Sequence, residues 1–247
     1  MPISYLEQSP APALSGWVEC LWCVESSDPV VRYPVPPDGC LDIVYSPGQG
    51  LRAVGTMTME QSFRFDAGVH SVGIRFQPGR AGVFLSVSPA ELTDRIAPLA
   101  DLWGRQAGEL ERQLEDAPSA AASLEILRAA IRRPPRQPGS VHQAIAAMTQ
   151  AHGAADLDWI ARQANLSPRQ FRRRCLEESG LTPKVLCRVL RFRRACRLAE
   201  QTARPDWPDI ACQAGYFDQA HLIRDFRDFT GRTPVAVFSN TAAPQTR

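Results

Sequence analysis

Arginines cluster in the segment that follows Ser167, and their spacing indicates a shared surface. If a helix begins at Pro168, a rotation of about 100° per residue puts Phe171 and Cys175 on one side. Three arginines then lie together on the opposite side: Arg169, Arg172 and Arg173. A guanidinium group matches the two acceptors of guanine in the DNA major groove, and it also binds phosphate. This face is therefore a candidate DNA-contacting surface, although ordinary solvated charges would give the same pattern.

An internal repeat strengthens the DNA-binding interpretation. The pattern Ile-Ala-x-Gln-Ala occurs at residues 160–164 and again at residues 210–214, an offset of 50. After a one-residue insertion, an offset of 51 continues the alignment. It pairs Phe171 with Leu222, Arg173 with Arg224, Cys175 with Phe226, Gly180 with Gly231, and Thr182-Pro183 with Thr233-Pro234. In the second copy the side away from Leu222 and Phe226 carries Ala220, His221 and Arg224.

Each copy has the local signals of a short helix, a tight turn and a second helix. Ser167 is a favourable N-cap with Gln170 three residues later, and Asp218 is placed to cap the equivalent helix. Asn165 and Gly215 stand where the first helix must end, and both residue types tolerate the left-handed conformation. We therefore predict two helix-turn-helix units, whose second helices enter the major groove.

A helix from Pro183 to about Gln201, capped by Thr182, is predicted between the two units. Its length of roughly 27 Å is enough to hold two recognition helices near one DNA turn apart. It carries five arginines: Arg188, Arg191, Arg193, Arg194 and Arg197. These point in all directions around a helix, so some must pair with Asp or Glu or lie in solvent, and we assign them no site.

The segment from Asp206 to Phe238 resembles the signature of the AraC/XylS family of bacterial transcription regulators. The motifs that carry the resemblance are Ile210-Ala211, Gly215-Tyr216, Asp218-Gln219-Ala220-His221, Phe226, Gly231 and Thr233-Pro234. The first unit and the pattern Arg191-x-x-x-Ala195-x-x-Leu198 fit the same family. Four positions depart from its usual residues: Asn165, Cys175, Leu186 and Val237.

The resemblance implies an all-α C-terminal domain that binds double-stranded promoter DNA, with RNA polymerase as a plausible partner. It places base contacts on Arg169, Arg172, Arg173, Gln219, Ala220, His221 and Arg224. The helical-wheel argument gives the same residues except Gln219.

Charge divides the 247-residue chain at a proline-rich segment, Arg132 to Ser140. Residues 1–138 carry a net charge of −4, and residues 139–247 carry +6. This asymmetry is typical of a nucleic-acid-binding domain joined to a sensing or assembly domain, although two unlike solvated surfaces also fit it. We expect an effector or assembly domain at 1–133, a linker at 134–139 and the DNA-binding domain at 140–240.

The first domain is predicted to be β-rich and then helical, which makes the chain α+β. The β-prone runs are Trp17 to Glu25, Cys40 to Ser46, Ala53 to Thr58, Ser62 to Phe65 and Val69 to Phe76. Ser88 to Glu91 forms a capping box, and leucines at 110, 114, 124 and 127, with Ile131, mark apolar stripes. The stripes either join two chains as a homodimer or pack on their own domain. Residues 37–44, 73–82 and 91–104 resemble a domain of unknown function often found ahead of AraC-type domains.

Two readings of the first domain's polar residues stay open. Asp38, Asp42 and Arg75 either line a pocket for an unknown small-molecule effector or form a structural ion pair or turn contact. As an alternative, Cys20, Cys23 or Cys40 acts as a reactive-thiol sensor. Cys20 and Cys23 have the spacing of a redox or zinc motif, but residues three apart on a strand face opposite sides. We expect all cysteines, including Cys175, Cys187, Cys196 and Cys212, to be reduced and buried.

Enzymatic readings find little support. The sequence has no P-loop, no Gly-x-Ser-x-Gly motif and no dinucleotide fingerprint, and His70 is the only histidine in residues 1–138. We therefore expect a regulator without catalytic, cofactor or metal site, and an enzyme with a DNA-binding appendage is the alternative. The sequence also lacks a long apolar run or a signal-peptide start, which favours a cytosolic protein without membrane contact.

Overall fold

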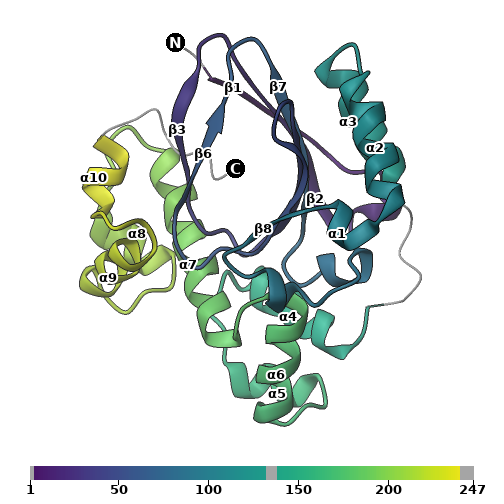
Figure 1. The fold of residues 1–247 in the computed structure, drawn as a ribbon. Helices are drawn as coiled ribbons and strands as arrows, with labels where there is room; N and C mark the ends of the chain where they lie inside the picture. Colours follow the sequence, from purple (N-terminus) through teal and green to yellow (C-terminus); the bar gives the residue numbers. More distant parts are fainter. Residues whose placement is uncertain (1–2, 132–137, 240–247) are drawn as a thin grey trace.

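All strands lie in the first 98 residues and the α-helices follow them in the computed structural model, which describes residues 3–131 and 138–239 (Figure 1). The expected α+β class is confirmed, with a β-rich N-terminal half followed by helices to the C-terminus. The proline-rich linker at 134–139 lies mostly outside the described residues. The domain boundaries that depend on it stay predictions.

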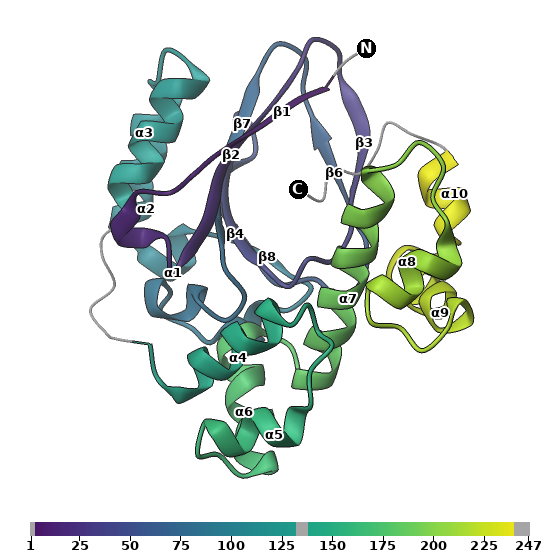
Figure 2. The ribbon, with the colours of Figure 1, turned by 180° about the vertical axis from the view of Figure 1, so that it is seen from behind.

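Two antiparallel sheets face each other in the N-terminal half (Figures 1 and 2). The larger sheet has the order β1-β2-β7-β4-β5-β8, with β1 Ile3–Gln8, β2 Val18–Ser26, β7 His70–Phe76, β4 Leu41–Ser46, β5 Gly50–Val54 and β8 Ile96–Pro98. The smaller sheet pairs β3 Val30–Val35 with β6 Gln61–Phe65. Together the sheets enclose an interior space.

Alternation along the strands separates two cores. On β4, Ile43 and Tyr45 face outward and Asp42 and Val44 face the interior, because successive side chains of a strand point to opposite faces. The ladder pairs Val44 with Arg52 of β5, which fixes Arg52 on the inner face as well.

Helices cover the outer face of the larger sheet: α1 Ala100–Trp103, α2 Arg105–Glu115 and α3 Ala120–Ala130 (Figure 1). Short 3₁₀ helices at Pro12–Leu14, Ala81–Phe84 and Pro89–Leu92 complete this half, and Ser88 caps the last of them with the predicted capping box. The leucine stripe, from Leu110 to Ile131, is buried in the core under these helices. It therefore packs on its own domain and is not free to join a second chain.

The predicted strands are partly right. Four of the five β-prone runs fall on β2, β4, β6 and β7, but the run from Ala53 to Thr58 is wrong beyond Val54. Thr58 binds the carboxylate of Asp94 through its amide and hydroxyl at 2.7 and 2.6 Å, so its polar groups take a side-chain partner in place of a strand. The strands β1, β3 and β8 were not predicted, and each has only one neighbour in its sheet.

The C-terminal half consists of helices around a separate core: α4 Ser140–Gln150, α5 Leu157–Gln163, α6 Pro168–Ser179, α7 Pro183–Glu200, α8 Trp207–Gln213, α9 Gln219–Thr230 and α10 Pro234–Ser239. The helix α7 runs between α4–α6 and α8–α10 (Figure 2). Its Phe192 packs edge-on against Phe226 and Phe229, with ring centroids 4.8 and 5.2 Å apart. Among the residues that the structure describes, no helix is long and apolar enough to cross a membrane.

We predict that Leu127→Ala destabilises the fold by about 2–5 kcal/mol, because Leu127 is fully buried between α3 and the sheet and its removal leaves a cavity. Urea unfolding followed by circular dichroism measures the effect. Val31→Ala is the control, since Val31 is 77% exposed and should change the free energy of unfolding by no more than about 0.5 kcal/mol. Equal stability of the two variants would contradict the packing described.

Candidate DNA-binding surface and effector cavity

The first recognition helix, α6, presents its arginines to solvent. Asn165 ends the turn before it with a positive φ of 53°, and Ser167 and Gln170 form the predicted capping box. Phe171 and Cys175 are buried in the C-terminal core. The candidate residues Arg169, Arg172 and Arg173 are all exposed on the other side of the helix. Arg173 also donates to Glu177 one turn later, at 2.9 Å.

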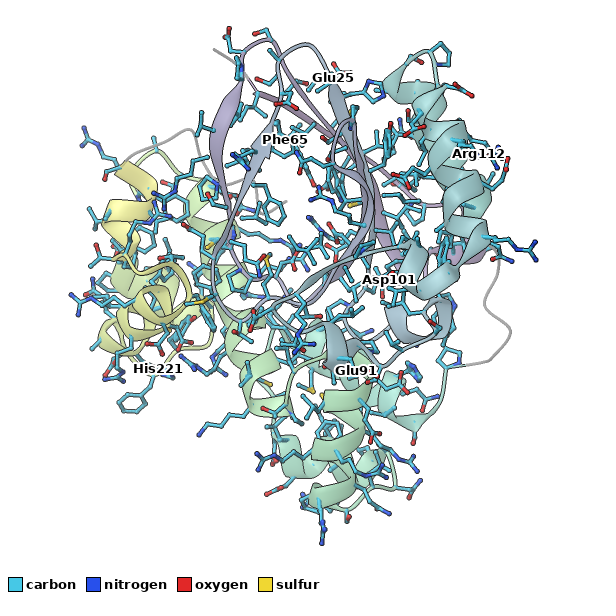
Figure 3. The ribbon with its side chains drawn as sticks, viewed as in Figure 1. Glu25, Phe65, Glu91, Asp101, Arg112 and His221 are labelled. Atoms are coloured by element: carbon cyan, nitrogen blue, oxygen red, sulfur yellow. The ribbon has the colours of Figure 1, made fainter. Side chains whose placement is uncertain are left out.

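The second recognition helix, α9, repeats this arrangement. Gly215 has a φ of 81°, and the carboxylate of Asp218 accepts a 2.6 Å bond from the amide of His221, as predicted. The candidates Gln219, Ala220 and Arg224 are exposed. His221 is half-buried because its ring packs edge-on against Tyr216 with centroids 5.1 Å apart. Figure 3 shows His221 at the outer margin of the α8–α10 unit.

Arginines of α7 make contacts within the protein that hold neighbouring helices and turns in place. Arg188 pairs with Asp225 and Asp228 of α9, and Arg191 and Arg194 donate to the carbonyls of Gly153 and Gln213 at 2.9 and 2.8 Å. The expectation that some of these arginines pair with carboxylates is confirmed. Thr182 stands at the N-cap position of α7, but the predicted capping interaction is wrong, because its side chain makes no bond to the first turn of the helix.

One exposed aromatic side chain escaped the sequence reasoning. In the first copy the amide of Leu166 donates to the carbonyl of Ala161, and in the second the amide of Tyr216 donates to the carbonyl of Ala211, so Leu166 and Tyr216 are equivalent. The N-caps Ser167 and Asp218 are also equivalent. Phe217 is therefore the inserted residue of the second copy, and it is 93% exposed beside the N-terminus of α9. The change of offset from 50 to 51 could have identified it.

A cavity that is partly open to solvent lies between the two sheets. Its wall is largely aromatic and aliphatic, with contributions from Tyr5, Trp22, Tyr33, Phe63 and Phe65. Side chains from both sheets enter this space (Figure 3). The three proposed effector-pocket residues Asp38, Asp42 and Arg75 all line the cavity.

These three residues also form an ion-pair cluster. They therefore fit both hypotheses from the sequence, a pocket lining and a structural ion pair. Arg75 lies 3.2 Å from Asp38 and 3.3 Å from Asp42, and Glu7 is 3.7 Å away. Trp22 donates to Asp42 at 3.0 Å. Burial raises the pKa of Asp42 to about 6, even though the Arg75 guanidinium lowers it and Asp38 adds to the rise. The cluster thus holds more carboxylates than its one guanidinium neutralises.

The thiols are placed poorly for reaction. Cys20 faces the cavity side of β2 and Cys23 the opposite side, as predicted, and both are buried, as is Cys40. Burial raises the pKa of Cys23 to about 11 and the pKa of Cys40 well above its ordinary value. The expectation of burial is wrong for Cys212, which is exposed on α8. Within residues 3–131 and 138–239, no three His, Cys, Asp or Glu side chains are grouped to hold a metal ion.

A buried ion pair joins the two halves of the chain. Arg193 of α7 is 5% exposed and binds the carboxylate of Glu19 on β2 through both terminal nitrogens. The thiol of Cys40 lies 3.4 Å from Glu19 and 3.8 Å from Arg193. Burial raises the pKa of Glu19, but the Arg193 guanidinium more than offsets it, so the net pKa is below the ordinary value. The backbone amide of Cys40 donates to the carboxylate of Asp38 at 2.9 Å, which links this pair to the cavity.

The N-terminal half also binds the C-terminal ends of both recognition helices. The hydroxyls of Ser88, Thr56 and Thr93 donate to the carbonyls of Glu177, Ser179 and Gly180 at the end of α6, at 2.7, 2.9 and 2.8 Å. At the end of α9, the amide of Glu60 donates to the carbonyl of Phe229 at 2.6 Å, and its carboxylate pairs with Arg232. Residues 55–60, here called the bridging segment, therefore contact both units.

Comparison with known proteins agrees with this division. Residues 6–98 match the model of a domain of unknown function (DUF6597), and residues 160–240 match the model of a helix-turn-helix domain. No curated protein sequence matches the chain significantly. A solved structure of ToxT from Vibrio cholerae is 11% identical over 95% of this chain and 96% of that chain, with a TM-score of 0.43. Another, of ToxT with an unsaturated fatty acid bound, is 10% identical over 94% of each chain, also with a TM-score of 0.43.

We predict that Glu19→Ala lowers the free energy of unfolding by about 3–5 kcal/mol, because it leaves the Arg193 guanidinium buried without its carboxylate. Urea titration of the full chain measures the loss. The double variant Glu19→Leu with Arg193→Met should recover most of it, since neither charge then remains buried. A single variant as stable as the parent would show that the pair does not hold the halves together.

Proposed function

We propose that this chain, which carries an AraC-type helix-turn-helix domain at residues 160–240, is a one-component transcription regulator controlled by a small molecule in its N-terminal cavity. The AraC-type domain makes it a DNA-binding transcription regulator. The observation that carries the proposal is the shared contact: the bridging segment holds both recognition helices, and its Gly55 and Met57 line the cavity.

The DNA-contacting residues of this proposal are the exposed ones on the two recognition helices: Arg169, Arg172, Arg173, Gln219, Ala220, His221 and Arg224. They belong to two unlike helices in one chain, so a single chain can read a non-palindromic site. Arg173 is the strongest candidate base reader because the repeat pairs it with Arg224. The half-buried His221 is the weakest, since Tyr216 already holds its ring.

The effector side of the proposal rests on the cavity. Concave, mostly apolar spaces with a few converging polar groups are the usual sites for small ligands. A ligand there changes the packing of Met57 and Val54, which adjoin the hydroxyl and amide groups that bind α6 and α9. Occupancy then sets the relative placement of the two recognition helices.

Two further partners remain predictions. RNA polymerase is predicted from the family resemblance, and a second copy of the chain from the leucine stripe. The leucine stripe that suggested a homodimer is used within the chain, so a dimer requires another surface. Burial of Cys20, Cys23 and Cys40 disfavours the thiol-sensor alternative.

We predict that the full chain binds duplex DNA with an affinity that falls roughly 10³-fold or more between 50 and 200 mM salt, because its arginines displace condensed counterions. Fluorescence anisotropy on a duplex selected from a random pool measures this.

Arg173→Ala should weaken binding to the selected duplex by about 1–3 kcal/mol and relax the preference at one base pair. Arg112→Ala is the control, since Arg112 lies exposed on α2 and far from the recognition helices. Equal losses on all duplexes would make Arg173 a phosphate contact.

We also predict that Phe217→Ala weakens binding to the selected duplex about tenfold, because an exposed ring beside the start of α9 gains apolar contact with the DNA surface. The same anisotropy assay measures it. Val31→Ala removes an equally exposed apolar side chain from β3 and should leave the affinity unchanged. If Phe217→Ala binds as tightly as the parent, the inserted residue has no part in DNA contact.

A further inference from the structure

Arg52 is a cation of the cavity wall that pairs with no carboxylate among the residues that the structure describes. It lies on the inner face of β5 opposite Val44, and its side chain is half-buried. Its Nε is shielded from solvent and meets no hydrogen-bond acceptor among the residues that the structure describes. Burial lowers the pKa of Arg52, with no acidic neighbour to raise it. A desolvated guanidinium without a carboxylate is unfavourable, so this position is suited to an incoming anion.

The other buried cation of the cavity is already neutralised. Arg75 has Asp38, Asp42 and Glu7 within 3.7 Å, so three carboxylates surround one guanidinium. Burial, with a smaller contribution from Asp38, raises the pKa of Asp42. A second anion beside Arg75 would be repelled. The remaining arginine of the wall, Arg64 on β6, is exposed to solvent. Of the arginines that line the described cavity, Arg52 is thus the one that combines partial burial with a guanidinium group not paired with a carboxylate.

The surroundings of Arg52 define the rest of the ligand. Val44 and Val54 flank it on the larger sheet, and Trp22 lies further along the same face. The smaller sheet faces it with Phe63 and Phe65, the latter edge-on to Tyr33 with centroids 5.3 Å apart. A planar guanidinium binds a carboxylate through two parallel bonds. One guanidinium balances one charge, so this apolar wall disfavours a doubly charged phosphate.

We propose that the cavity binds an organic monocarboxylate with an aromatic body, its carboxylate on Arg52 and its ring between Trp22 and the Phe63–Phe65 wall. A regulatory role for this ligand rests on the function proposed above, but binding of the ligand to the cavity does not. Arg52 is three residues before Gly55, where the chain enters the bridging segment. The ligand therefore contacts strand β5, which continues into the bridging segment that binds the C-terminal ends of both recognition helices.

Three probes of one shape and different charge test this proposal: 4-phenylbutanoate, 4-phenylbutanamide and 4-phenylbutylamine. Isothermal titration of the full chain measures their dissociation constants. We expect the acid to bind about tenfold or more tightly than the amide, because the charge-assisted pair forms only with the carboxylate, and the amine to bind most weakly. In Arg52→Gln the acid should lose this advantage and bind like the amide.

Arg32→Gln is the matched control. It removes the same charge from the exposed surface of β3, and Arg32 does not line the cavity, so the preference for the acid should persist. Circular dichroism confirms that both variants fold, and Arg52→Gln should be no less stable than the parent because burial disfavours the Arg52 charge and no described carboxylate offsets this cost. Equal binding of acid and amide to the parent overturns the proposal. So does a preference that survives in Arg52→Gln, or a failure of all three probes at millimolar concentration.

DNA binding by the same preparations separates this inference from the proposed function. If the parent binds DNA but does not distinguish acid from amide, the ligand class is wrong and the regulator stands. If the parent prefers the acid through Arg52 but does not bind DNA, the cavity stands and the regulator is wrong.

Discussion

The carbonyl groups at the ends of the two recognition helices are the constraint on which the arrangement of this chain depends. A helix leaves its last carbonyls without intrahelical donors. Here the N-terminal half supplies them: Thr56, Ser88 and Thr93 at α6, and the Glu60 amide at α9. Each recognition helix is held at its C-terminal end, and the residues at the start of each helix are exposed, as the proposed DNA contact requires.

The buried ion pair adds orientation to this docking. Arg193 points out of α7 into the N-terminal half, and Glu19 meets it from β2. Ions taken out of water gain little net stability from pairing, but separating them inside the protein costs much more. The pair therefore favours one arrangement of the two halves over others. Its contact with Cys40 brings it within one side chain of Asp38 and the cavity.

The cavity is asymmetric in charge. One part holds Arg75 among three carboxylates, whereas Arg52 pairs with none of the carboxylates that the structure describes. Partial burial in a mostly apolar wall strengthens the electrostatic interactions of both arginines relative to bulk water. The strand β5, which carries Arg52, continues into the bridging segment, so one stretch of backbone contacts both the cavity and the two recognition helices.

Local signals in the sequence determined the C-terminal units: the caps at Ser167 and Asp218, the turns at Asn165 and Gly215, and the exposed arginines follow from interactions within a few residues. The α+β class also followed from pattern. The tertiary structure alone decided the rest. An edge strand such as β1 pairs with only one neighbour, so its sequence shows a weak hydrophobic pattern. The leucine stripe is compatible with a dimer or with packing on a sheet, and only the position of the sheet decides between them. Arg52 reads as an ordinary surface charge, because its burial without a described carboxylate partner depends on strands that only folding brings together.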